Sequence, residues 1–98
     1  MTPAEELARL QAVCGALAHP ARRQILLIIR FRGGSMTAGE VAARFSCSWP
    51  TTTRHLRVLL ESGLLDCERT GRERRYRLAV DRLGPLERWL GWFRDGAP

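Results

Sequence analysis

Apolar residues recur at helical spacing over the first third of the chain, and each run begins with residues that favour a helix start. Thr2 can cap the first helix and Pro3 fits its first turn, so the pattern predicts a helix that ends near Ala18. Pro20 starts a second helix that extends to Phe31, and within it residues 25–29 (ILLII) form a continuous apolar run. Such a run could also be a buried strand, but the proline start and the length favour a buried helix.

Two shorter helices are predicted in the middle of the chain, with a tight turn between them. Thr37 and Glu40 have the spacing of a capping box, which starts a short helix that ends near Phe45. Ser48 is a good N-cap for the next helix, and Gly63 stands where a left-handed residue would end it. Two short helices joined by a tight turn form a helix-turn-helix unit.

Beyond this point apolar and polar residues alternate, which is the period of β-strands. Two alternating segments flank a turn at residues 70–73, where Gly71 gives the backbone its freedom, so we expect a two-stranded hairpin. Asp81 is expected to cap a last helix, with Pro85 in its first turn. The predicted apolar stripe of this helix contains Leu83, Leu86, Trp89 or Leu90, and Phe93.

The order of these elements, ααααββα, predicts a mainly α fold with a β-hairpin wing, the winged helix-turn-helix class. The 98 residues suffice for one modest core, so we expect a single domain over residues 1–98 whose stability would gain from dimerisation. No apolar run approaches the roughly 20 residues of a membrane span. The N-terminal segment carries two acids and lacks the apolar centre of a signal peptide, so we expect a cytoplasmic protein.

The charge balance predicts a polyanionic partner. Sixteen basic and ten acidic residues give a formal net charge of +6 and a pI near 10.9. Every basic residue is an arginine, whose planar guanidinium suits phosphates and guanine edges. A genome rich in G and C would also favour arginine codons, but it would not explain the net positive charge. The composition therefore favours nucleic acid as the partner.

The helix predicted from Ser48 to Gly63 has one apolar and one polar face. With Leu56 at the centre of the buried face, its neighbours there at 100° per residue are Thr52, Leu59, Leu60 and Gly63. The opposite face holds Thr51, Arg54, Val58 and Glu61, flanked by Pro50 and Arg57, with Thr53 on the border. Hydroxyl and guanidinium groups read base edges, and helix-turn-helix proteins use the start of the second helix for this contact.

A polar helix face by itself fits ordinary solvation, so the neighbouring elements decide between the two interpretations. The capped helix before it and the arginine-rich hairpin after it favour DNA binding. Arg72 at the hairpin tip is the best candidate for the minor groove or its phosphates. Arg74 and Arg75 point to opposite faces of their strand, so we expect one of them to reach DNA. The alternative is a solvated basic hairpin without DNA contacts.

Residues 17–78 resemble the ArsR-type (ArsR/SmtB) winged helix-turn-helix repressors. The matching stretches are ALAHPARRQIL (16–26), TAGEVAARF (37–45), SWPTTTRHLRVLLESGLL (48–65) and RTGRERRYRL (69–78). The resemblance implies a homodimer built on the first and last helices, residues 1–18 and 81–95. It also implies binding to an inverted repeat in double-stranded DNA and, usually, repression of transcription.

The resemblance assigns Trp49, Thr51, Thr53 and Arg54 to the surface that contacts bases and phosphates, and His55 also fits the pattern. Together with the helix faces and the wing, the predicted DNA-binding residues are Ser48, Trp49, Thr51, Thr53, Arg54, His55, Arg57, Arg72, Arg74 and Arg75. In the turn, Ser46 and Cys47 replace the Gly-apolar pair usual in the family. Trp49 replaces a smaller polar residue; its indole could stack on a sugar or a thymine methyl, or it could cover the turn.

No cofactor, metal site or catalytic site is predicted. The family's arsenic-type site resembles Cys-x-Cys before the turn, and its zinc-type site needs His and acidic ligands on the last helix. The corresponding segments here contain no Cys and no His, respectively. His19 is interpreted as a helix cap, and neither His19 nor His55 has a nucleophile beside it, so enzymatic chemistry has no support.

Cys14, Cys47 and Cys67 are widely spaced, which argues against a disulfide framework, and we interpret them as reduced, buried apolar residues. One alternative stays open. In a dimer, Cys14 could approach Cys47 of the other subunit, giving a repressor that responds to thiol oxidation or to a soft metal. The sequence identifies no inducer.

Overall fold

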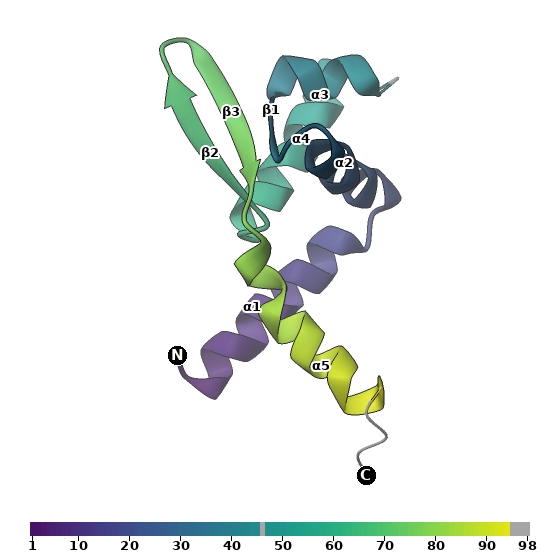
Figure 1. Cartoon of the computed structure of the whole chain (residues 1–98), viewed down its shortest axis with the longest axis vertical. Coiled ribbons are helices and arrows are strands. Elements are labelled where there is room, and N and C mark those ends of the chain that lie inside the picture. The colour runs from purple at the N-terminus through teal and green to yellow at the C-terminus, as the bar shows by residue number, and fades with distance from the viewer. Residues whose placement is uncertain (46, 95–98) are drawn as a thin grey trace.

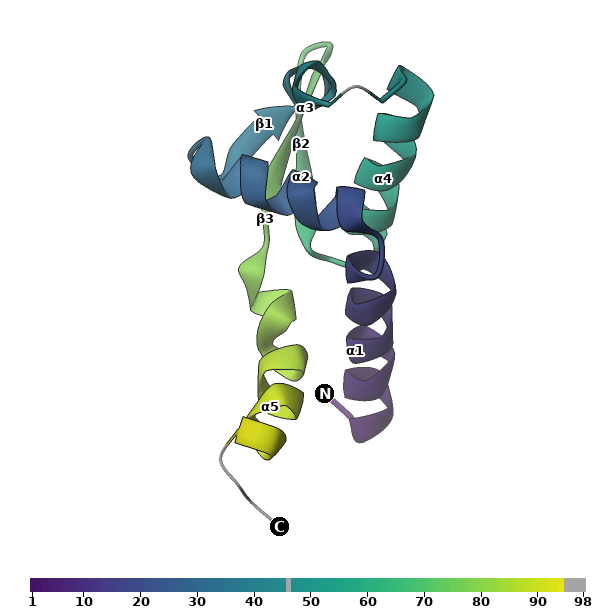
Figure 2. The same ribbon diagram turned by 90° about the vertical axis from the view of Figure 1, so that its right-hand side faces the viewer.

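The computed structural model describes residues 1–45 and 47–94. The elements are, in chain order, α1 (Pro3–Leu17), α2 (Pro20–Phe31), β1 (Ser35–Thr37), α3 (Ala38–Arg44), α4 (Trp49–Glu61), β2 (Leu65–Thr70), β3 (Glu73–Leu78), the 3₁₀ helix η1 (Val80–Leu83) and α5 (Gly84–Arg94). The molecule is elongated, with extents of 49 × 26 × 23 Å. Helices α1 and α5 lie side by side at one end, and α3, the start of α4 and the hairpin lie at the other (Figure 1 and Figure 2).

The predicted starts of the first four helices are confirmed, because each is fixed by a local hydrogen bond. The Thr2 and Glu5 side chains form a capping box on α1, and Thr37 and Glu40 form a second one on α3. The Nδ1 atom of His19 accepts a hydrogen bond from the backbone of α2, which confirms its interpretation as a cap. The hydroxyl of Ser48 accepts one from the first turn of α4.

The end of α1 is tied to the start of α2 by two arginines. Arg22 donates from Nε to the carbonyl of Ala16 at 2.7 Å, and Arg23 donates from Nη1 to the carbonyl of Leu17 at 2.6 Å. Carbonyls at a helix C-terminus have no partner within the helix and carry partial negative charge, so guanidinium groups stabilise them. Arg22 and Arg23 therefore contribute to the fold.

The predicted two-stranded hairpin is a three-stranded sheet. Strand β1 pairs antiparallel with β3, so that the strand order is β1-β3-β2. The hairpin itself and its turn at Gly71 are confirmed. A strand of three residues is too short to show alternation in the sequence. Its pairing depends on the buried contact of Met36, which lies opposite Tyr76.

The prediction that Asp81 caps the last helix is wrong. Residues Val80–Leu83 form a 3₁₀ turn without a side-chain cap, and Leu83 belongs to this turn. Helix α5 starts at Gly84, with Pro85 in its first turn as predicted. Proline has no N–H to donate to the carbonyl four residues earlier, so an α-helix running from residue 81 would lack that bond. Residue 95 lies outside the described part of the chain, as does the turn residue Ser46.

One hydrophobic core joins the helix-turn-helix unit to the sheet. It consists of Val13, Ala16, Ile25, Ile29, Met36, Val41, Leu56, Leu59, Leu64, Leu65 and Tyr76. Every regular element except η1 and α5 contributes to this cluster, and Pro85 is the one residue of α5 that is buried. The core therefore holds α4 and the wing in place, while most of α5 lies outside it. None of the helices in the described part combines the length and the apolar character that a membrane span needs.

Gly63 ends α4 in the way that its position predicts. Its φ is 81°, and its N–H donates to the carbonyl of Leu60 while that of Leu64 donates to Leu59, each at 3.1 Å. This pair of bonds is a Schellman motif. A Cβ on Gly63 would lie 2.9 Å from Cγ of Arg82, so the turn also packs against η1.

We expect Gly63→Ala to destabilise the protein more than Gly33→Ala, as measured by urea unfolding. Gly33 ends α2 with the same motif and a φ of 101°, but nothing lies within 4 Å of its added Cβ. The control should be destabilised by about 1–2 kcal/mol from the left-handed backbone alone. Gly63→Ala should be destabilised further because the Arg82 side chain has to move, and equal effects would contradict this packing.

Candidate nucleic-acid interface

Helix α4 turns one seam of side chains into the core. Thr52, His55, Leu56 and Leu59 are buried, and they follow one another at positions that share a helix face. The predicted burial of Thr52, Leu56 and Leu59 is confirmed. Because these four residues face the core, the opposite face of the helix points outward. Arg54 and Arg57 are exposed on that face, and Thr51 is half-buried there.

The start of α4 carries several hydroxyl groups that form hydrogen bonds within the helix. The Ser48 hydroxyl donates to Oγ1 of Thr51 at 2.9 Å, and it accepts from the backbone N–H of the same threonine. The hydroxyl of Thr53 donates to the carbonyl of Trp49 at 2.8 Å. These bonds fix the rotamers of Thr51 and Thr53, and each hydroxyl oxygen keeps an accepting lone pair for an outside donor.

Trp49 is 56% exposed and lies in a concave surface between the helix-turn-helix unit and the wing. This surface is lined by Thr37, Ala38, Gly39, Trp49, Arg72, Glu73 and Arg74. Trp49 therefore faces the gap between α3 and the hairpin tip, and an indole in this position can stack on a sugar or a base methyl. A DNA contact of Trp49 stays a prediction.

His55 corrects the sequence prediction, which placed it on the DNA-binding surface. The residue is only 7% exposed, and its ring lies against that of His19, with 4.5 Å between ring centroids. Among the described residues, its Nδ1 has no hydrogen-bond partner. The spacing of His55 three residues from Thr52 and four from Leu59 is the signal that would have placed it inward.

The environment of His55 disfavours a positive charge. Burial lowers the pKa of the imidazole below its ordinary value of 6.5, and the nearby His19, Arg22 and Arg54 lower it further. The residue is therefore neutral in the folded protein at neutral pH. Its role is to hold α4 against the start of α2.

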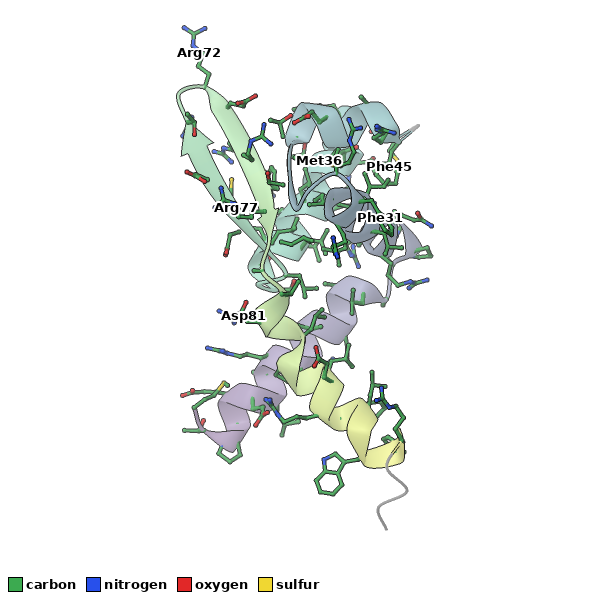
Figure 3. The ribbon with its side chains drawn as sticks, viewed as in Figure 1. Phe31, Met36, Phe45, Arg72, Arg77 and Asp81 are labelled. Atoms are coloured by element: carbon green, nitrogen blue, oxygen red, sulfur yellow. The ribbon has the colours of Figure 1, made fainter. Side chains whose placement is uncertain are left out.

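The wing presents arginines in two different situations. Arg72 extends from the tip of the hairpin, away from the body of the molecule (Figure 3), and Arg74 is exposed as well. Arg77, further down β3, forms an ion pair with Glu68 on the neighbouring strand at 2.5 Å. The tip is thus the part of the wing whose guanidinium groups are available to a partner.

Arg75 makes contacts within the protein, and a DNA contact of this residue stays a prediction. It is half-buried, and its Nη1 donates to the Ser35 hydroxyl at 3.3 Å while its Nη2 lies 3.6 Å from Oε1 of Glu40. Of the neighbouring pair on β3, Arg74 therefore faces solvent and Arg75 faces β1 and α3. The pKa of Glu40 is lowered by the backbone and hydroxyl of Thr37, which form its capping box, and further by Arg75 and Arg32.

The sequence pattern predicts Glu40 only as a cap, and it does not place Ser35 in the site. The sequence holds no signal for Glu40 beyond the capping box, because a carboxylate that is 46% exposed is solvated without a cationic neighbour. The pairing of β1 with β3 brings Arg75 close to Ser35 and Glu40, and no pattern in the sequence predicts this pairing.

The cysteines differ from the prediction of three buried residues. Cys14 and Cys47 are exposed, and Cys67 is half-buried. Helix α1 lies at the C-terminal end of α4 (Figure 2), whereas Cys47 precedes its N-terminal end. A helix of 13 residues is about 20 Å long, so the two thiols of one chain are too far apart for a disulfide. Within residues 1–45 and 47–94, no three His, Cys, Asp or Glu side chains are grouped to hold a metal ion.

The buried face of α4 holds the start of this helix exposed, with its hydroxyl groups and arginines on the outside. A hairpin with an exposed basic tip lies beside it. This arrangement defines a winged helix-turn-helix DNA-binding domain. A family profile described as a helix-turn-helix domain matches residues 17–68. The chain belongs to this helix-turn-helix family and, within it, to the ArsR-type transcriptional regulators. The family consists of regulators of transcription and not of enzymes.

Two repressors are similar to this chain in sequence. Transcriptional repressor SdpR of Bacillus subtilis is 33% identical over 75 residues, which are 76% of this chain and 81% of the relative. The biofilm growth-associated repressor of Agrobacterium fabrum is 37% identical over 70 residues, which are 71% of this chain. The chain spans 58% of the length of that second relative.

Solved structures share the fold. An ArsR-like transcriptional regulator from Rhodococcus sp. RHA1 is 32% identical with a TM-score of 0.75, covering 93% of this chain and 82% of that one. The homodimeric winged helix-turn-helix DNA-binding domain Mb0332 from Mycobacterium bovis is 24% identical with a TM-score of 0.73, covering 99% and 90%. These likenesses confirm the predicted fold class.

We expect the free energy of unfolding to fall as the pH drops below about 6.5, and His55→Gln to flatten this dependence. The folded state keeps His55 neutral, because its pKa is lowered, while the unfolded state takes up a proton near its ordinary pKa. Below that pH the unfolded state binds more protons and is favoured. Urea unfolding at several pH values between about 5 and 8 measures the slope. An unchanged slope in the variant would assign the proton uptake to another group.

Proposed function

We propose that the protein is a transcriptional repressor that binds an inverted repeat in double-stranded DNA as a homodimer. The observation that carries this proposal is the position of the exposed start of α4 and of the wing tip, at the same end of the molecule (Figure 2). The apolar helices α1 and α5 lie at the opposite end. One end would thus contact DNA while the other contacts the second subunit.

At the DNA end, the start of α4 enters the major groove and the wing follows the neighbouring backbone. Arg54 is exposed on the outer face, one turn into the helix, where a guanidinium can form paired hydrogen bonds with a guanine edge. Ser48, Thr51 and Thr53 offer hydroxyls beside it, and Arg57 lies one turn further along for a phosphate. The exposed Trp49 completes this surface.

The dimer would form through the exposed apolar surface of α1 and α5. The large apolar side chains exposed on these two helices are Leu7, Trp89, Leu90, Trp92 and Phe93. Several of them border a hollow lined by Pro3, Glu6, Leu7, Leu10, Pro85, Arg88, Trp89 and Trp92. So much apolar surface on a chain of 98 residues favours a partner subunit, as does the similarity to a homodimeric domain of known structure.

Residues 1–18 and 81–95 are thus the proposed dimerisation segments. Each chain carries +6, so a dimer carries 2 × 6 = +12, which favours binding that weakens steeply with salt. The recognition helices of a dimer would lie one DNA turn apart, about 34–36 Å. We propose no metal-binding site and no metal inducer for this repressor.

We expect Arg54→Ala to weaken binding to the selected operator by about 1–3 kcal/mol and to relax the sequence preference. Arg72→Ala should instead weaken binding evenly across sequences, because Arg72 at the wing tip is assigned to phosphates or to the minor groove. In vitro selection of bound duplexes followed by fluorescence anisotropy on selected and scrambled DNA measures both effects. Equal, sequence-independent weakening in the two variants would contradict the assigned roles.

We expect Trp92→Glu to convert the dimer to a monomer and to reduce operator affinity. Trp92 is 66% exposed in the single chain, and the proposed interface would cover it. A carboxylate in its place would lose its hydration there without gaining a partner. Phe31→Glu is the matched control, since Phe31 is a 79% exposed aromatic residue on α2 (Figure 3). Sedimentation velocity should find a dimer for the wild type and for Phe31→Glu, and a monomer for Trp92→Glu. A monomeric wild type, or a dimeric Trp92→Glu, would refute the assigned interface.

A further inference from the structure

Strand β1, helix α3 and the wing meet at one residue. Thr37 ends β1, caps α3 through its hydroxyl, and lies directly opposite Arg75 in the pairing of β1 with β3. The backbone of the wing is therefore one strand away from the first turn of α3, the helix that precedes the recognition helix.

The side chain of Arg75 crosses this junction. One of its nitrogens donates to Ser35 on β1, and another lies 3.6 Å from the carboxylate of Glu40 on α3. The same Glu40 oxygen accepts the backbone N–H of Thr37 at 2.9 Å in the capping box. A single planar guanidinium thus joins three elements, which a lysine, with its one nitrogen on a flexible stem, cannot do in the same way.

We propose that Glu40 and Arg75 form a clamp that sets the orientation of the wing relative to the recognition helix, and that Arg75 acts as a positioning residue for DNA binding. The clamp acts by holding the wing tip and the start of α4 at the separation that one DNA site requires. This inference rests on the proposed function, because it concerns how the DNA-binding surface is arranged.

An exposed ion pair of this kind contributes little to overall stability, and the two side chains are 39% and 46% exposed. Its effect on binding is larger for a dimer, which has two clamps and must place both wings at once. Removal of the clamp should therefore leave the unfolding midpoint almost unchanged while it weakens DNA binding.

The decisive variant is Glu40→Gln. Glutamine can still accept the Thr37 N–H, since Gln also serves at this capping-box position, but it carries no charge for Arg75. Removing an acidic residue beside DNA should by itself strengthen binding. The clamp predicts the opposite sign, a weakening of about three- to tenfold for the dimer. Glu73→Gln is the matched control, because Glu73 is an exposed acid of the wing for which the described residues show no ion pair, and it should bind slightly more tightly.

A second variant separates positioning from a direct phosphate contact. Arg75→Lys keeps the charge, so a phosphate contact would survive it, but a clamp that needs two nitrogens would not. We expect a weakening similar to that of Glu40→Gln, with the slope of log affinity against log salt unchanged. Arg72→Ala, by comparison, should make that slope shallower by about 0.9 for each phosphate that is no longer neutralised, or about 1.8 for a dimer.

The experiment measures the affinity of the full chain for a fluorescent duplex selected by the wild type, from about 50 to 300 mM salt, with thermal unfolding of each variant. Weakening in both clamp variants, at unchanged slope and unfolding midpoint, supports the inference. Wild-type-like or tighter binding by Glu40→Gln overturns it while leaving the proposed function intact. A wild type that binds no duplex at low salt refutes the proposed function, and this inference with it.

Discussion

The burial of one seam of α4 is the constraint on which the interface depends. Leu56 and Leu59 have no exposed surface, and the hydroxyl of the buried Thr52 is satisfied within the helix by the carbonyl of Ser48. A helix that packs this seam into the core can point only its other face outward. The exposure of Arg54 is therefore a consequence of core packing, and a change in the core would rotate the residues that we propose for DNA contact.

The two ends of the molecule differ in their surface: one end exposes arginines and hydroxyl groups, and the other exposes large apolar side chains. The core joins the helix-turn-helix unit to the sheet, while α5 contributes Pro85 as its single buried residue and leaves both tryptophans largely exposed. The Glu6–Arg88 ion pair ties α5 to α1 across this poorly covered end. A small domain that exposes so many aromatic side chains at one end is completed most simply by a second copy of itself.

Net charge does not reveal which arginines bind DNA. Arg22 and Arg23 cap the end of α1, and Arg75 joins β1 and α3 to the wing. The candidates for DNA contact are the arginines that make no such internal contacts in the described structure, above all Arg54 and Arg72. Charge composition indicates the class of partner, whereas the internal bonds of each guanidinium distinguish structural arginines from functional ones.

The sequence by itself determined the features that depend on neighbours within one helical turn. Capping boxes at Thr2 and Thr37, the Ser48 cap and the left-handed Gly63 are local hydrogen-bond geometry, and all were predictable. Only the tertiary structure decided what distant segments do to one another. Strand β1 exists because Met36 meets Tyr76, and His55 is buried because α2 lies against α4. Arg75 turns toward β1 for the same reason, since Ser35, which accepts its hydrogen bond, is 40 positions away, beyond the reach of any local pattern.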